Sequence, residues 1–283
     1  MTFTLYDPNM NKLDYPVGVR PLDLLVSSIE KERKEQQIDG IPGVIDYGYN
    51  LKGREIKMNF MTEHYHDTFD HRLQRDEIYN LFDSYPYLYV SDNTVPSRVL
   101  KITIDGSFTP ERYGYWYSTF EVDARVSSLP FWRTKYTTQD VETNGYSGLV
   151  EKFGTADGIN ADNTKYTFTE TTFKVWNGGN VTVDPRNMML KIRLYRLVTD
   201  GKFTMTNKTT GEVFKYTAKR TGNTVDLNGV KALVGLASNR LRETNRKFIS
   251  LAPGENEITI TGERLITFNS ISPFIINKGW FNG

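Results

Sequence analysis

The chain has 283 residues, 35 basic and 34 acidic side chains, a net charge of +1 and no cysteine. This length suggests two domains, and the composition is that of a globular protein. The absence of cysteine excludes disulfides, thiolate nucleophiles and cysteine-based metal sites. The balanced charge argues against nucleic-acid binding, which needs a basic excess. The first residues lack a secretory signal and the apolar runs are too short to span a bilayer, so we expect neither Sec-type export nor a membrane partner.

The first half of the sequence predicts strands and one helix. Residues 21–37 fit either a helix or a strand that runs into a charged loop. Residues 53–64 alternate between apolar and polar side chains, as a half-buried strand does, and residues 98–106 and 113–129 predict two more strands. Residues 67–83 predict a helix from the three- and four-residue spacing of their apolar side chains. We expect the apolar side of that helix to hold Phe69, Leu73, Ile78, Leu81 and Phe82. One face of the strand at 113–129 is expected to hold Trp116, Phe120, Val122, Ala124 and Val126.

All three histidines, His64, His66 and His71, lie in one stretch with Asp67 and Asp70. The zinc hydrolases of the β-lactamase type use H-x-H-x-D-H, whereas this stretch has two more residues before the final Asp-His pair. No histidine follows His71 to complete a two-metal site. A site for one metal ion stays open, with His64 and His66 on one strand face and Asp67 or His71 as a further ligand. We favour the alternative, a strand end beside a helix start where these side chains cap, donate hydrogen bonds and meet solvent. No metal or cofactor is therefore expected.

Other catalytic motifs do not emerge from the sequence. The stretch GYSGL at 145–149 lacks the G-x-S-x-G spacing of a nucleophile elbow, and no Walker loop, G-x-G-x-x-G or H-E-x-x-H occurs. The sequence does not predict an enzyme.

The second half of the sequence differs from the first in composition and in the length of its predicted strands. Residues 136–165 are rich in Gly, Asn, Asp and Thr and predict a linker. From 166 onward, short strands alternate with turn signals such as NGG, TDG and PGEN, which predicts a β-sandwich or barrel. Trp176 and Trp280 are candidates for stacking on sugars, although such side chains more often fill a core or an interface.

Three segments carry a family resemblance: GIPGVIDYGYNLKGREIKMNF (40–60), RDEIYNLFDSYPYLYVSDNTVPSRVLKITIDGSF (75–108) and EVDARVSSLPFWR (121–133). They resemble the distal tail protein (Dit) family of siphophages that infect Gram-positive bacteria. The resemblance implies a mainly β fold with a β-rich α+β N-terminal domain, 1–135, that contains one helix. After the linker it implies a galectin-like or carbohydrate-module-like β-sandwich, 166–283. It also favours a strand within 21–37.

For function, the resemblance implies a non-enzymatic hub at the tail tip of the virion, made in the cytoplasm of the host bacterium. The hub would be a homohexameric ring around the DNA exit channel, with the tail tube protein and the baseplate or receptor-binding proteins as partners and without sequence-specific contact to nucleic acid. The alternative is an adsorption protein that binds host cell-wall glycans through Trp176 or Trp280. A third hypothesis is a metal-dependent hydrolase that uses His64, His66 and His71.

Overall fold

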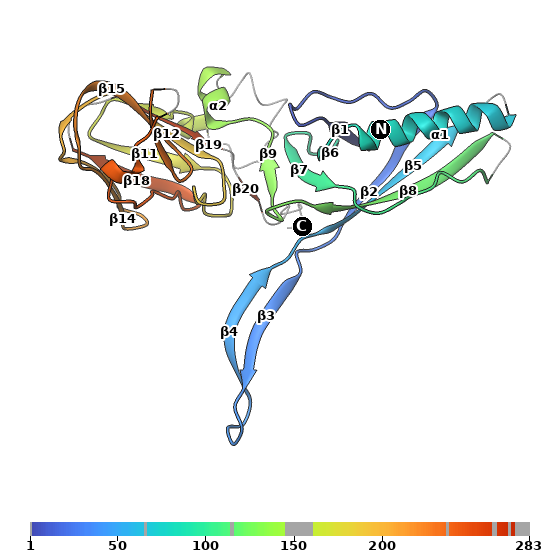
Figure 1. Ribbon diagram of the computed structural model, residues 1–283, viewed down its shortest axis with the longest axis horizontal. Helices are drawn as coiled ribbons and strands as arrows, with labels where there is room; N and C mark the ends of the chain where they lie inside the picture. The colour runs from blue at the N-terminus through green and yellow to red at the C-terminus, as the bar shows by residue number, and fades with distance from the viewer. Residues whose placement is uncertain are drawn as a thin grey trace. The chain divides into compact units, whose positions relative to one another are not determined.

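The computed structural model forms two compact units, unit 1 (Met1–Phe131) and unit 2 (Trp132–Gly283) (Figure 1). It describes residues 2–64, 67–113, 116–144, 161–235, 238–261, 265–270 and 273–274. The protein is mainly β, as predicted. The predicted domain limits at 135 and 166 stay predictions, because most of the expected linker lies outside the described residues. No helix in the described part of the chain is long and apolar enough to cross a membrane.

Unit 1 is built on an antiparallel sheet with the strand order β1-β6-β7-β8-β5-β2, beside a separate two-stranded ribbon. Its elements are β1 (Phe3–Tyr6), β2 (Val19–Val26), β3 (Lys31–Gln37), β4 (Val44–Leu51), β5 (Glu55–Glu63), α1 (Asp67–Asp83), β6 (Leu88–Asp92), β7 (Arg98–Thr103) and β8 (Tyr117–Val126). The ambiguous segment 21–37 therefore forms strands, so its helical alternative is wrong. The strands predicted from 53–64, 98–106 and 113–129 are confirmed as β5, β7 and β8.

The core of unit 1 lies between the sheet and helix α1. Strands β5 and β8 pair with Phe60 opposite Phe120, and both rings are buried. Phe60 stacks on Phe120 with ring centroids 5.0 Å apart, and meets the edges of Phe3 and Phe82 at 5.3 and 5.7 Å. Because Phe82 belongs to α1, this aromatic cluster joins the helix to the sheet.

Helix α1 has the predicted bounds, but its buried face differs from the expected one. Ile78 and Phe82 are buried as predicted, whereas Leu73 is 66% exposed and the prediction for it is wrong. Going back from Ile78 by one helical turn leads to Gln74, and a further three residues lead to His71, and both are buried. The helix therefore turns two polar side chains toward the sheet. The 3.6-residue period places Leu73 about 100° from Gln74 and about 160° from His71, so Leu73 points away from the sheet.

Strand β8 alternates as predicted along its whole length. Phe120, Val122, Ala124 and Val126 are buried, and the intervening side chains are exposed. Trp116 precedes the strand and is 57% exposed, so its predicted place on the buried face is wrong.

Unit 2 contains two antiparallel sheets, in the orders β10-β19-β12-β15-β16-β17 and β11-β18-β13-β14, and the pair β9–β20. Its elements are β9 (Trp132–Thr134), α2 (Thr138–Asn144), η1 (Ala161–Asn163), β10 (Thr167–Phe168), β11 (Thr172–Asn177), β12 (Leu190–Asp200), β13 (Phe203–Asn207), β14 (Glu212–Tyr216), β15 (Lys219–Asn228), β16 (Lys231–Val234), β17 (Ser238–Asn239), η2 (Leu241–Glu243), β18 (Gly254–Ile260), β19 (Leu265–Ser270) and β20 (Pro273–Phe274). Helix α2 lies in the segment expected to be a linker. It is attached to β19, because Thr138 Oγ1 and Gln139 Nε2 both donate to the carbonyl oxygen of Phe268, at 3.0 and 2.8 Å.

One hydrophobic core joins the two larger sheets of unit 2. It holds fully or almost fully buried side chains of both, such as Val175 and Ile258 from one sheet and Ile192 and Val225 from the other. This arrangement confirms the predicted β-sandwich. Its likeness to galectins in particular stays a prediction.

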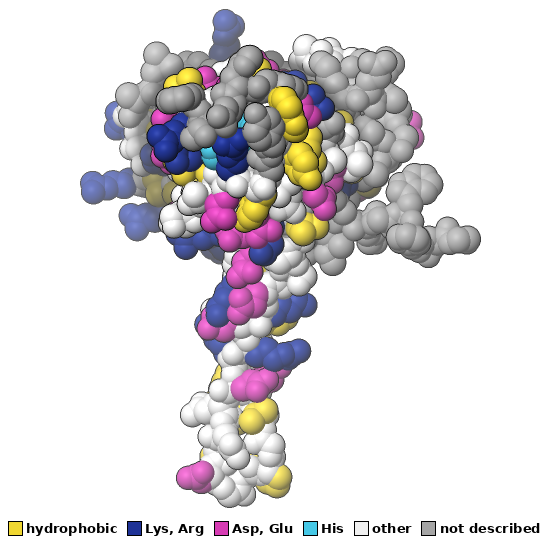
Figure 2. Space-filling view, turned by 90° about the vertical axis from the view of Figure 1, so that its right-hand side faces the viewer, with side chains coloured by type: hydrophobic (Ala, Val, Ile, Leu, Met, Phe, Trp, Pro, Cys, Tyr) yellow, Lys and Arg dark blue, Asp and Glu magenta, His cyan; other side chains and the backbone are white. Residues whose placement is uncertain are grey.

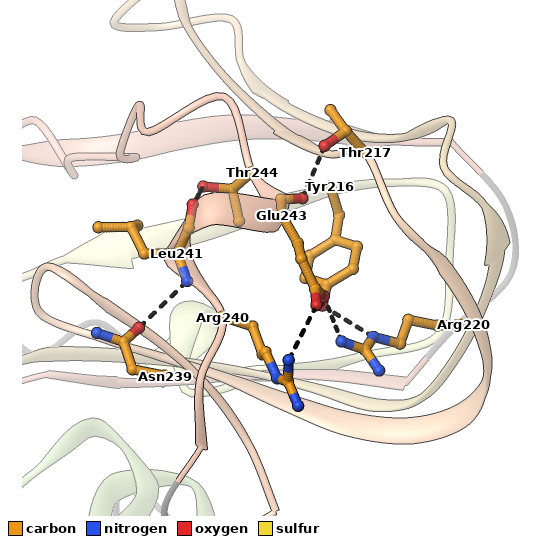
Figure 3. A network of polar contacts seen from close by, with 8 residues as sticks. All are labelled: Tyr216, Thr217, Arg220, Asn239, Arg240, Leu241, Glu243 and Thr244. Atoms are coloured by element: carbon orange, nitrogen blue, oxygen red, sulfur yellow. Dashed lines mark hydrogen bonds and ion pairs between the residues drawn. The ribbon is translucent and has the colours of Figure 1, made fainter.

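A polar network fastens the short helix η2 to the edge of this sandwich (Figure 3). Glu243 accepts hydrogen bonds from the Tyr216 hydroxyl and from Arg220, while Arg220 Nε also donates to Tyr216 Oη at 2.8 Å. Arg240 lies 3.6 Å from the same carboxylate. Because the Tyr216 side chain is fully buried, its hydroxyl must find partners inside the protein.

Candidate functional site

The histidines lie where strand β5 passes into helix α1. His64 is fully buried, and its backbone N–H donates to the carbonyl oxygen of Trp116 at 3.0 Å. The ring of His71 meets the ring of His64 edge-on, with centroids 5.4 Å apart. His66, the third member of the predicted cluster, lies outside the described residues.

The two histidine rings are buried and have few hydrogen-bond partners among the described residues. Both ring nitrogens of His64 and the Nε2 atom of His71 are buried and have no hydrogen-bond partner among the residues that the structure describes. Burial lowers the pKa of His71, and His64, Arg75 and Arg112 lower it further by repulsion. Among the described residues, no group of three His, Asp or Glu side chains is placed to hold a metal ion. The expectation that these histidines meet solvent is wrong for His64 and His71, because His71 lies on the face of α1 that is turned to the sheet and His64 is fully buried beside it.

The two tryptophans predicted as sugar-stacking candidates belong to unit 2. Trp176 lies on β11 and points to the outer face of the four-stranded sheet, since its neighbours Val175 and Asn177 are buried. Its ring is half-buried and lies 3.8 Å from the position that a Cβ would take at Gly254. Trp280 lies outside the described residues.

The most exposed feature of unit 1 is the ribbon of β3 and β4 with its turn, residues 31–51, which we call the arm. Every side chain of β3 is exposed, and so are most of those of β4. The arm extends away from the sheet of unit 1 (Figure 1). A single two-stranded hairpin is marginally stable in water, so the arm needs support from elsewhere.

Some of that support comes from polar contacts across the arm and at its base. Arg33 donates to Asp46 at 3.0 Å, and the Tyr47 hydroxyl donates to Gln36 at 3.1 Å. At the base, Lys52 lies 3.2 Å from Glu30. These contacts are exposed to water, and each adds little stability.

A second exposed feature lies at the far end of the unit 1 sheet, where β5 ends and β2 and β8 begin. The Gln74 side-chain amide donates to the carbonyl oxygens of Val17 and Glu63, at 2.7 and 3.1 Å, and so draws these backbones together. Val17, just before β2, and Trp116, just before β8, are exposed at this end of the sheet, at 88% and 57%. Figure 2 looks at this end of unit 1, where hydrophobic side chains lie close to histidine and to several basic groups.

The outer face of the same sheet is polar and grooved. A groove of about 780 Å³ crosses β2, β5 and β8 next to residues 109–113. Lys57 pairs with Glu121 at 2.7 Å and with Asp123 at 3.7 Å. Acidic side chains outnumber basic ones along this groove and the adjoining one: Asp23, Glu55, Asp105, Glu111, Glu121 and Asp123 against Lys57 and Arg125.

Sequence reasoning did not single out the arm. The turn IDGIPG, between two runs that can form strands, was a hairpin signal, and Gly40 and Gly43 do have φ of 84° and 91°. The sequence pattern of the two segments that form β3 and β4 did not indicate that both faces of this ribbon are exposed to water.

Comparison with known proteins gives the class first. Residues 18–123, most of unit 1, match the family of the phage tail protein RIFT-related domain. No curated protein matches the sequence. Unit 1 therefore contains a phage tail domain, and the predicted structural role in a phage tail is confirmed.

Solved structures add the particular fold. The chain is similar to the Dit (gp 19.1) protein of phage SPP1, with 13% identity over 96% of this chain and 99% of that chain, and a TM-score of 0.68. It is also similar to a chain of the activated phage p2 baseplate with Sr, with 10% identity over 95% and 97% of the two chains and a TM-score of 0.46. The predicted resemblance to distal tail proteins is confirmed, and the whole chain has the fold of the SPP1 Dit protein.

Proposed function

We propose that this protein is the distal hub of a siphophage tail. Six copies would form a ring around the DNA exit channel and join the tail tube protein to baseplate and receptor-binding proteins. The observation that carries this proposal is the phage tail domain that occupies residues 18–123. The SPP1 protein of the same fold is described as a paradigm of the hub adsorption apparatus in phages that infect Gram-positive bacteria.

The arm supports assembly from several copies. The ribbon exposes Ile and Tyr side chains to water. Because exposed apolar surface favours association, this composition favours contact of the arm with another protein. In a ring, the arm would be covered by another chain. The role is one of contacts between proteins, so we propose no catalytic activity.

The acidic outer face of the unit 1 sheet suits a channel for DNA. A polyanion that must pass without binding is repelled by carboxylates and retained by a basic excess. Asp23, Glu121 and Asp123 supply exposed carboxylates on this face. We propose that this face borders the channel, and that the protein is made in the host cytoplasm before it joins the tail.

The test is the mass and shape of the purified protein. Light scattering of the full chain should give six times the 32.6 kDa chain mass, with rings in negative-stain images. The matched control replaces residues 29–52 by Asn-Gly, which removes the arm and leaves the sheet intact. It should keep the melting temperature of the parent and lose the ring. A parent protein that stays monomeric at every concentration and with purified tail tube and baseplate partners would contradict the proposal.

The second candidate function is glycan binding by unit 2. The observation in its favour is Trp176, a half-buried indole on an outer sheet face beside Lys174 and Glu255, which pair at 2.7 Å. An aromatic ring next to polar groups is a common sugar-binding arrangement. Binding to host cell-wall polysaccharide that Trp176→Ala abolishes would support it. Equal binding by parent and variant, or none by either, would count against it.

A further inference from the structure

We propose that Asn228, at the turn between β15 and β16 of unit 2, is a site of spontaneous deamidation. Its side-chain amide is converted into a carboxylate without an enzyme, and water is the only co-reactant. This inference does not depend on the proposed function, because it concerns one covalent change within a single chain.

The reaction needs an asparagine that is followed by glycine. The backbone nitrogen of the glycine attacks the side-chain carbonyl carbon of the asparagine, and a succinimide ring closes as ammonia leaves with the proton of the glycine N–H. Water then adds to either carbonyl of the ring and opens it, which gives aspartate or isoaspartate. Glycine favours the attack because it has no Cβ to hinder its nitrogen. Both steps are substitutions at a carbonyl carbon, so no oxidant or reductant takes part.

Of the Asn-Gly pairs in the sequence, at 144–145, 177–178, 228–229 and 282–283, the structure describes 177–178 and 228–229 in full. The fold restrains the first of these two. Asn177 is buried, and its Nδ2 atom donates to the carbonyl oxygens of Val181 and Leu251 at 2.9 and 3.0 Å. Its Oδ1 atom accepts from the Gly179 N–H at 3.0 Å. These three hydrogen bonds hold the side-chain carbonyl in place and keep it from turning toward the next nitrogen.

Asn228 has no such restraint on its side chain. The side chain is exposed and makes no hydrogen bond to any described residue. The Gly229 N–H donates to the carbonyl oxygen of Leu190 at 3.1 Å, so this one contact has to open before the nitrogen can attack. The opening is local, because the turn lies at the end of a hairpin whose second strand, β16, has four residues.

Two lysines favour the reaction electrostatically. Asn228 lies opposite Lys191 of β12 and opposite Lys231 of β16. Residues that are directly opposite in an antiparallel pair share one face of the sheet, so both ammonium groups lie on the side of the Asn228 amide. Nearby cations stabilise the negative charge that develops on the Gly229 nitrogen and the carboxylate of the product. Lys191 also pairs with Asp226 at 3.3 Å, whereas Lys231 makes no ion pair with a described residue.

Peptide mass mapping of the full chain tests the site. After prolonged incubation at neutral pH, the peptide that contains Asn228 should show the mass of a carboxylate and separate into aspartate and isoaspartate forms. It should react at least about tenfold faster than the peptide that contains Asn177, because the buried side chain reacts only after a costlier local opening. In urea, where the fold no longer protects Asn177, the two peptides should react at similar rates.

Equal rates for the two peptides in the folded protein would overturn the proposal. So would an Asn228 that stays intact in the folded protein for as long as the chain in urea needs to react completely.

Two variants test the mechanism. Asn228→Gln keeps an amide, but its longer side chain closes the ring less readily, so the variant should stay unmodified. Lys231→Gln removes the cation without an ion pair and should slow the reaction by about twofold. The matched control is Lys219→Gln, at the other end of β15, which should leave the rate unchanged. Modification of Asn228→Gln at the rate of the parent would contradict the succinimide route, and equal rates for the two lysine variants would contradict the electrostatic contribution of Lys231.

Discussion

Glu243 of unit 2 offers the sharpest stability prediction, because one carboxylate serves three donors (Figure 3). It accepts from the buried Tyr216 hydroxyl and from Arg220, and it pairs with Arg240. Glu243→Ala leaves the Tyr216 O–H without an acceptor in the interior. A hydrogen bond to a charged group contributes about 1.5–3 kcal/mol. Because Arg240 and Arg220 keep partial access to water, we expect Glu243→Ala to lower the free energy of unfolding by about 3 kcal/mol. Glu243→Gln keeps an acceptor, so we expect it to lower the free energy of unfolding by only about 1 kcal/mol.

The pH dependence follows from the same contacts. The hydrogen bond from Tyr216, and then that from Arg220, lower the pKa of Glu243 below its ordinary value of 4.5. A carboxyl with a lowered folded-state pKa stabilises the protein above the unfolded value, and this contribution is lost as the pH falls through the folded-state pKa. The difference between parent and Glu243→Ala should therefore be full at pH 7 and shrink below pH 4.5.

Urea unfolding followed by tryptophan fluorescence measures both effects. The matched control is Glu255→Ala, which removes an exposed ion pair with Lys174 and should leave the midpoint unchanged. The reasoning is refuted if Glu243→Ala is no more destabilising than Glu255→Ala, or if its effect is the same at pH 7 and pH 3.5.

Two further predictions concern unit 1. Gly18 has φ of 80°, and a Cβ there would lie 2.3 Å from the Glu63 carbonyl oxygen and 2.6 Å from Gln74 Nε2, so Gly18→Ala should cost about 2–4 kcal/mol from strain and clash together. Gly40→Ala is the control, with φ of 84° and open space around it; equal urea midpoints for the two variants would contradict the clash. His71 has a pKa below its ordinary 6.5, mainly through burial, so the folded state prefers it neutral and stability should fall as the pH drops from 6.5 toward 5. His71→Leu should reduce that fall, and a variant with the same pH profile as the parent would show that another group causes it.

Much of unit 1 could be predicted from local sequence. The alternation of Met58 and Phe60 with polar residues placed β5 in a half-buried sheet, and that of Phe120 and Val122 did the same for β8. Helix α1 followed from its apolar spacing, with the bounds that the structure has. Apolar side chains recur every 2 residues in a strand and every 3.6 residues in a helix, because each of these elements turns one side to a core. This recurrence can be recognised in the sequence.

Burial of particular side chains depended on tertiary contacts. His64 and His71 look like surface residues in sequence, yet both are buried where α1 packs on the sheet, while Leu73 fits an apolar stripe and faces outward. The phase of a helix against a sheet is set by the cluster around Phe60, whose members come from four distant segments.

The candidate surfaces illustrate the same division. Sequence alone contained the hairpin turn at 38–43, the family resemblance and the polar face of β8. Only the tertiary structure decided that the arm stands clear of the sheet (Figure 1). The physical reason is that a strand pattern records which side chains can be buried, whereas the neighbours that bury them, or leave them free for another molecule, are brought together by the fold.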